Sequence, residues 1–195
     1  MMHHPIRRYP VKKEEKKETV DLAEAKEQVE KVCKKVALLH LSYAKTIMNE
    51  LGDKEGTKLI LKAIKDYATR IGEKVKEDVA VNGMTNALEN YKEDLPLYGM
   101  HDGTEKVEVN GEKRTRAFGC VMGKIWKELG EDNIGRLYCY VDPAKYMAYN
   151  PNYKLVHTQS IPDGDAYCEF TVKPTTEQER KDFLKKDKDW RYIDK

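Results

Sequence analysis

Residues 120–174 read CVMGKIWKELGEDNIGRLYCYVDPAKYMAYNPNYKLVHTQSIPDGDAYCEFTVKP and contain three of the four cysteines of the chain. Cys139 and Cys168 are each flanked by tyrosine and by apolar residues that favour strands, so we expect both on short strands closed by turns. Pro143 and Pro151 bracket the segment after Cys139. Because each proline restricts the residue before it, this segment is expected to be a loop or a single helical turn that overhangs the strands.

The chain has 195 residues, and 36 basic residues against 34 acidic ones leave a net charge of +2. The two signs alternate along the chain, which is unlike the basic patch of a nucleic-acid-binding protein. No run approaches the ~20 apolar residues that span a bilayer, and residues 1–18 lack the apolar core of a signal peptide. We therefore expect a cytoplasmic protein, without a membrane partner, whose cysteines are free thiols.

The first half of the chain predicts helices. Residues 1–18 form an expected tail in which His3 and His4 are solvated rather than metal ligands. Apolar residues at three- and four-residue steps follow on both sides of Gly52, and they predict two long helices within residues 20–77 that form an antiparallel hairpin. The first stripe comprises Leu22, Ala25, Val29, Val32, Val36, Leu39, Tyr43 and Ile47. A third, shorter helix is expected over 79–91, and Cys33 and His40 are interpreted as core residues.

The second half predicts strands. Asn110-Gly111 indicates a type I′ hairpin turn within residues 106–118. Further strands are expected at 136–141, 153–161 and 166–173, with a turn at 162–165 between the last two. The predicted fold class is therefore α+β, with a long helical hairpin packed on a small antiparallel sheet. We expect one domain over 19–174, with a helical half (19–95) and a sheet half (96–174). A charged helix over 175–195 should dock through Phe183, Leu184 and Trp190.

Cys120 precedes an expected helix over 121–129. The free N–H groups and the positive dipole end of a helix start lower the pKa of a nearby thiol. Cys120 is therefore the electrostatic candidate for a thiolate.

The sequences LYCYVDP, then Asn-Pro, then PDGDAYCEFTV resemble the C-terminal half of the L-2-amino-thiazoline-4-carboxylic acid hydrolase family. The stretch ELGDKEGTKLILKAIKDYATRIGEKV resembles the helical hairpin of that family, so the resemblance covers residues 40–174. It implies that a cyclic isothiourea, a small-molecule substrate, is opened by hydrolysis without an organic cofactor. Water, or first a thiolate, would add to the amidine carbon before the carbon–sulfur bond breaks.

That chemistry needs a nucleophile or base, a carboxylate facing the amidinium, and a cation or N–H cluster for the substrate carboxylate. The candidates for the first two roles are Cys120, Cys139, Asp142 and Cys168, and candidate substrate contacts are His101, Asn150 and Tyr167. The sequence does not identify the third group.

Other interpretations stay open. Single cysteines are more often packing residues, Asp142 also suits a turn or a helix cap, and Tyr167 also suits strand packing. His101 and His157 could instead be solvated, His157 could join the cysteines as a zinc ligand, and the long helices could form a homodimer interface. The alternative function is a non-catalytic small-ligand or zinc-binding module that uses Cys120, Cys139 and Cys168.

Overall fold

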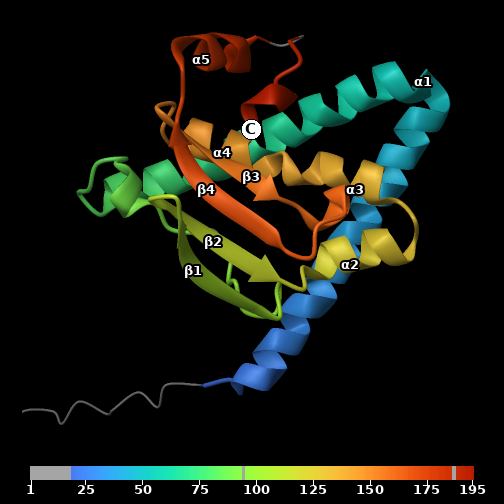
Figure 1. Ribbon diagram of the computed structural model, residues 1–195, viewed down its shortest axis with the longest axis horizontal. Helices are drawn as coiled ribbons and strands as arrows, with labels where there is room; N and C mark the ends of the chain where they lie inside the picture. The colour runs from blue at the N-terminus through green and yellow to red at the C-terminus, as the bar shows by residue number, and fades with distance from the viewer. Residues whose placement is uncertain (1–18, 94, 186–187) are drawn as a thin grey trace, which may run out of the picture.

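A computed structural model describes residues 19–93, 95–185 and 188–195 of the chain, so the expected tail with His3 and His4 lies outside the described residues. The elements are α1 (Leu22–Val81), a 3₁₀ turn (Leu88–Asn90), β1 (Gly103–Val109), β2 (Glu112–Phe118), α2 (Val121–Glu128), α3 (Asp132–Cys139), α4 (Val141–Tyr149), β3 (Tyr153–Gln159), a 3₁₀ turn (Ile161–Asp163), β4 (Cys168–Pro174), α5 (Glu177–Leu184) and a 3₁₀ turn (Arg191–Ile193). The short helices α2–α4 pack on α1, and α4 also packs on β3 (Figure 1). Within the described residues, every helix is too short or too polar to cross a membrane.

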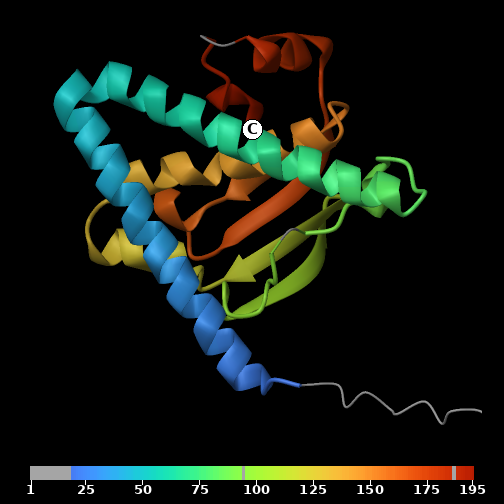
Figure 2. The same ribbon diagram turned by 180° about the vertical axis from the view of Figure 1, so that it is seen from behind.

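The helix α1 consists of two arms that meet at Gly52. Asp21 caps the first arm by accepting hydrogen bonds from the backbone N–H groups of Ala23 and Glu24. Gly52 has φ 75°, a left-handed conformation that glycine adopts without a Cβ penalty. The two arms diverge from this bend (Figure 2), so the break was predicted correctly but the expected antiparallel packing along the helices was not. The helix continues to Val81, and no separate helix spans 79–91.

The first arm of α1 turns a different face to the core from the one that its apolar periodicity indicates. Val32, Leu39 and Tyr43 on the expected stripe are 59%, 56% and 66% exposed. The buried face instead comprises Cys33, Ala37, Leu41 and Ala44. The small side chain of Ala37 lets Trp126 of α2 approach so closely that its indole N–H donates to the Ala37 carbonyl oxygen at 3.3 Å.

The core interpretation of Cys33 and His40 is confirmed. Cys33 is 7% exposed, and the His40 ring packs edge-on against Trp126 and Tyr138. His40 also donates from Nε2 to the carbonyl oxygen of Ile134 at 2.9 Å.

The four strands form one antiparallel sheet in the order β1-β2-β4-β3. Asn110 and Gly111 have φ of 54° and 78°, which confirms the predicted type I′ turn between β1 and β2. Together with the helices this sheet confirms the α+β class. Glu169 links the two central strands, β4 and β2. Its carboxylate on β4 accepts hydrogen bonds from Arg114 and Arg116 of β2, at 2.7 and 2.8 Å.

The strand expected at 136–141 and the loop expected at 143–151 are both wrong. Cys139 ends α3, and the segment bracketed by the prolines is the helix α4. Pro143 lies in the first turn of α4, where a missing N–H breaks no intrahelical hydrogen bond, so this proline supports a helix start. The second arm of α1 packs closely on α4, since a Cβ atom on Gly72 would lie 2.2 Å from the Lys145 carbonyl oxygen.

The segment after β4 is more deeply buried in the fold than the expected surface helix would be. Thr176 and Glu179 form a capping box at the start of α5, but the helix ends at Leu184, and a 3₁₀ turn at Arg191–Ile193 follows it. Phe183 and Trp190 are buried as expected, whereas Leu184 is exposed, contrary to expectation. Ile193 and Asp194, near the end of the chain, are also buried.

Candidate functional site

A carboxylate–imidazole–carboxylate arrangement lies where α4, β3 and the C-terminal segment meet. Asp142, in the first turn of α4, places Oδ2 3.5 Å from Nε2 of His157 on β3. The other ring nitrogen of His157, Nδ1, lies 3.1 Å from both carboxylate oxygens of Asp194. The backbone N–H of His157 also donates to Asp194 at 2.8 Å. The side chains of His157 and Asp194 are 3% and 0% exposed, so this arrangement is shielded from solvent.

Arg136 of α3 completes the arrangement. Its Nη2 donates to Asp194 at 2.7 Å and its Nε donates to Asp163 at 2.7 Å. Burial by itself would raise the pKa of Asp194, but the hydrogen bonds and charges of His157 and Arg136 outweigh it and lower that pKa. Asp194 is therefore an ionised carboxylate at neutral pH, and an ionised carboxylate only accepts hydrogen bonds.

The three cysteines of residues 120–174 lie around Asp142. Cys120 is the N-cap of α2, Cys139 ends α3 and Cys168 begins β4. Cys120 packs with Cys168 against Ala117 and Ile161. Burial is the main cause of a raised pKa for Cys120, Cys139 and Cys168, and the charge of Asp142 raises the pKa of each of them further. The structure therefore brings the candidates Cys120, Cys139, Asp142 and Cys168 together.

Burial favours the neutral form of these thiols, which overturns the expected thiolate at Cys120. Burial raises the pKa of Cys120, and the backbone N–H groups of Gly123 and Met122 oppose this shift without reversing it. Burial also raises the pKa of Cys139 well above its ordinary value and raises that of Cys168 to about 12. The helix start contributes as expected, but desolvation outweighs it.

The three candidate substrate contacts have different surroundings. Burial lowers the pKa of His101, against the opposing charges of Asp142 and Asp102, and its Nδ1 is buried without a hydrogen-bond partner among the described residues. Asn150 caps the end of α4 and donates from Nδ2 to the Asn86 carbonyl oxygen at 2.8 Å, which is a structural contact.

Tyr167 packs on Phe118 with ring centroids 5.4 Å apart and lies under the guanidinium of Arg116. The described contacts of Tyr167 therefore match the packing interpretation, whereas the charge of Asp142 acts on His101.

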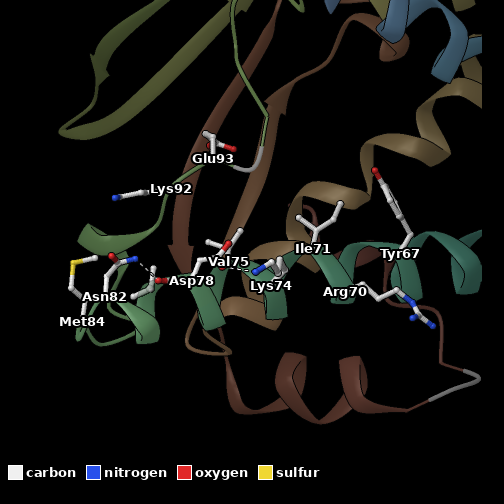
Figure 3. A pocket seen from close by; sticks show the side chains of 11 residues that line it. Tyr67, Arg70, Ile71, Lys74, Val75, Asp78, Asn82, Met84, Lys92 and Glu93 are labelled. Carbon is white, nitrogen blue, oxygen red and sulfur yellow. Dashed lines mark hydrogen bonds and ion pairs between the residues drawn. The ribbon is translucent and has the colours of Figure 1, made fainter. Parts of the chain in front are cut away.

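A cavity of about 580 Å³ lies between the second arm of α1 and residues 84–93 (Figure 3). Tyr67, Ile71 and Val75 line one wall, and Glu93 lies across from them. Glu93 connects this cavity to the arrangement above, because Lys145 Nζ lies 3.3 Å from Glu93 and 3.2 Å from Oδ1 of Asp142. A second cavity, of about 770 Å³, lies beside Tyr140 and the C-terminal segment. No cysteine lines either cavity.

The residues that hold a metal ion are usually three or four ligands grouped at one point. In the part of the chain that the structure describes, no three histidine, cysteine, aspartate or glutamate side chains are grouped in this way. The three cysteines are thus not arranged as the zinc alternative requires.

Sequence reasoning missed Arg136 and Asp194, and it considered His157 only as a solvated residue or as a ligand in the zinc alternative. Arg136 is the first residue of the strand expected at 136–141, and Asp194 lies 52 residues after Asp142 in a charged segment. Trp190 and Ile193 flank Arg191 and Tyr192 in the sequence, and both are buried. Their burial brings Asp194 inward. The apolar residues at 190 and 193 were the one available signal.

Comparison with known proteins identifies the family. The model of the family described as L-2-amino-thiazoline-4-carboxylic acid hydrolase matches residues 30–172. No curated protein and no solved structure matches the chain. The matched segment includes all three cysteines around Asp142, as well as Arg136 and His157, and it ends before Asp194. Because the family model spans most of its length, the chain belongs to the L-2-amino-thiazoline-4-carboxylic acid hydrolase family.

Proposed function

We propose that this protein hydrolyses a small cyclic isothiourea of the 2-aminothiazoline-4-carboxylate type. Membership of the family supports the reaction class. The observation that carries the residue assignment is the contact between Asp142 and His157, at 3.5 Å, in a cluster with three thiols. A partly buried carboxylate beside an imidazole is a combination that enzymes use to move protons.

The reaction adds one water molecule to the substrate. The water oxygen bonds to the amidine carbon, and the bond from that carbon to the ring sulfur breaks. One proton of the water ends on the ring nitrogen and the other on the departing sulfur. The product is an N-carbamoyl cysteine with a free thiol, so all atoms are accounted for and no oxidant or reductant is needed.

Asp142 and His157 take complementary roles in this proposal. The Asp142 carboxylate faces the cationic amidine, whose two N–H groups match two carboxylate oxygens. His157 removes the proton from the attacking group through Nε2, because Nδ1 is occupied by Asp194. General base catalysis of this kind contributes roughly 10²- to 10⁴-fold to a rate.

Two buried nitrogen atoms suit the carboxylate of the substrate. Nη1 of Arg136 and Nδ1 of His101 are buried without hydrogen-bond partners among the described residues. An unsatisfied buried donor costs about 1 to 3 kcal/mol, which a ligand oxygen would recover. Arg136 therefore supplies the cation that sequence reasoning could not name, and His101 assists it.

The cysteines act as neutral groups until substrate binds. Since burial raises the pKa of each thiol, a cysteine attacks the amidine carbon only after a base has taken its proton in the substrate complex. Attack by water needs no such step, and a neutral thiol then serves as the proton donor to the leaving sulfur. The two routes differ in whether a covalent adduct on cysteine forms.

The test is thiol release from 2-aminothiazoline-4-carboxylate, measured with a thiol reagent, with and without a chelator. We expect turnover by the wild type and strongly reduced turnover by Cys120→Ser, Cys139→Ser, Cys168→Ser and Asp142→Asn. Asp66→Asn is the control, because Asp66 is an exposed carboxylate of α1 that pairs with Arg70 and is not among the proposed site residues. Intact-protein mass spectrometry of rapidly quenched reactions distinguishes a cysteine adduct from direct attack by water.

Undiminished turnover in all four site variants would refute the residue assignment. Loss of turnover with chelator alone would point to a metal-dependent hydrolase. A wild type that opens no cyclic amidine would refute the proposed reaction and favour a non-catalytic ligand-binding protein.

A further inference from the structure

Asp194 belongs to a part of the chain that the family match does not cover. The match ends at residue 172, and Asp194 is the penultimate residue, 22 positions further on. Even so, its side chain is fully buried against His157 and Arg136, which lie inside the matched segment. The C-terminal segment therefore completes an arrangement whose other members come from the family core.

Apolar residues near the end of the chain dock the C-terminal segment beside His157. Trp190 and Ile193 are 3% and 0% exposed, and they share a cluster with Ala68, Ala144 and Met147 of α1 and α4. The indole of Trp190 also packs edge-on against Tyr140, with ring centroids 5.7 Å apart. These apolar contacts fix the backbone next to Asp194, so the carboxylate arrives at a defined position.

The hydrogen bonds around Asp194 require a proton on Nδ1 of His157. Asp194 is an ionised carboxylate and only accepts hydrogen bonds. Nδ1 of His157, 3.1 Å from both of its oxygens, must therefore be the donor. Nε2 then faces Asp142. The second hydrogen bond to Asp194, from the His157 backbone N–H, prevents the ring and the carboxylate from moving independently.

We propose that Asp194 is the positioning residue of the site, which holds His157 in the Nδ1-protonated form and presents Nε2 to Asp142 and the substrate. It touches His157 rather than the reacting atoms, so its effect on the reaction passes through the imidazole. Its kinetic consequence rests on the proposed function, but the protonation pattern of His157 does not.

Arg136 makes this arrangement stable. A carboxylate with no exposed surface would be costly to bury alone, and the guanidinium of Arg136 compensates it at 2.7 Å. Asp163 binds the same guanidinium through Nε and is half-exposed at the surface. The carboxylates of Asp142 and Asp194 therefore flank the His157 ring, and those of Asp194 and Asp163 flank the Arg136 guanidinium.

The first experiment needs no turnover. Nitrogen-15 NMR of ¹⁵N-histidine-labelled full-length protein reports which ring nitrogen of each histidine carries the proton, and the chain has five histidines to assign. We expect a proton on Nδ1 of His157 in the wild type and a shift toward the Nε2-protonated form in Asp194→Asn. A wild type with its only ring proton on Nε2, or an unchanged pattern in Asp194→Asn, would overturn the proposal.

The matched control is Asp189→Asn. Asp189 is a carboxylate of the same C-terminal segment, and its described hydrogen bonds are to Arg191 at the surface. This variant removes the same charge and should leave the His157 pattern unchanged. Fluorescence of Trp190 in a Trp126→Phe background shows whether the segment stays docked in each variant. If Asp194→Asn undocks, Asp194→Glu replaces it, and restoration of the wild-type pattern by the longer carboxylate supports the proposal.

The kinetic experiment follows if the wild type is active. Asp194→Asn should lower kcat by at least about tenfold and change KM by less than about threefold, because a misoriented base slows the chemical step more than binding. A loss confined to KM would show that Asp194 serves substrate binding and would overturn the positioning role. An inactive wild type would refute the proposed reaction and leave the NMR result standing.

Discussion

Oδ2 of Asp142 lies 3.5 Å from Nε2 of His157, although the two residues come from a helix and a strand separated by the turn at Asn150. The contact exists because α4 packs on β3. Its partners on the far side, Asp194 on the imidazole and Lys145 on the carboxylate, hold both groups in place. The predictions below start from this pair.

Removing either member of the pair should reduce turnover with little effect on folding. For Asp142→Asn and His157→Gln we expect kcat/KM to fall by roughly 10²- to 10⁴-fold, since each variant removes the proton-transfer partner. Steady-state kinetics with the thiol-release assay measures this loss. Asp66→Asn, which removes an exposed carboxylate of α1, is the control and should keep full activity.

The buried thiols should react slowly with alkylating reagents. Because burial raises the pKa of Cys120, Cys139 and Cys168, little thiolate is present at neutral pH, and iodoacetamide reacts with thiolates. Mass spectrometry of peptides after timed labelling should show all three alkylated far more slowly in the native protein than in the denatured one. Fast labelling of Cys120 in the native protein would show that Cys120 is a thiolate, as the helix start predicts, and would contradict the neutral thiol.

Glu169 should stabilise the sheet in a pH-dependent way. Burial works against ionisation, but hydrogen bonds from Arg116, Thr158 and Arg114 lower the pKa of Glu169 from 4.5 to about 2. A lowered folded-state pKa means that the stabilisation is present above the unfolded-state pKa and is lost as the pH falls from about 4.5 towards 2.

We therefore expect Glu169→Gln to lower the free energy of unfolding by about 2 to 3 kcal/mol at neutral pH, the size of a lost charged hydrogen-bond network. The difference from wild type should shrink as the pH falls through this window. Urea unfolding at a series of pH values measures it, and Glu105→Gln, at the exposed edge of the same network, is the comparison. A difference that stays constant with pH would contradict the assignment.

Close packing of α1 on α4 should be sensitive to one methyl group. A Cβ atom at Gly72 would lie 2.2 Å from the Lys145 carbonyl oxygen, so Gly72→Ala must push the two helices apart. Overpacking of this kind costs about 1 to 3 kcal/mol. Because Asp142 lies on α4, turnover should fall together with thermal stability. Gly103→Ala introduces the same methyl group where no atom lies within 4 Å, and both properties should remain as in the wild type.

The sequence by itself determined the features that depend on neighbouring residues. Asn110-Gly111 determined the β1–β2 hairpin, because both residues accept positive φ. Gly52 marked the bend in α1. The clustering of Asp142 with three cysteines also followed from one continuous stretch, residues 120–174, together with the family resemblance.

Only the tertiary structure decided which faces are buried and what the site contains. The first arm of α1 carries two apolar stripes, and contact with Trp126 selected the one with Ala37 over the one with Leu39. The segment around Cys139 has strand-forming residues, yet Pro143 at a helix start and packing against α1 made it helical. Desolvation, a property of the folded interior, reversed the expected pKa shift of Cys120. Asp194 reached His157 only because Trp190 and Ile193 are buried, and no local pattern encodes a contact between residues 37 positions apart.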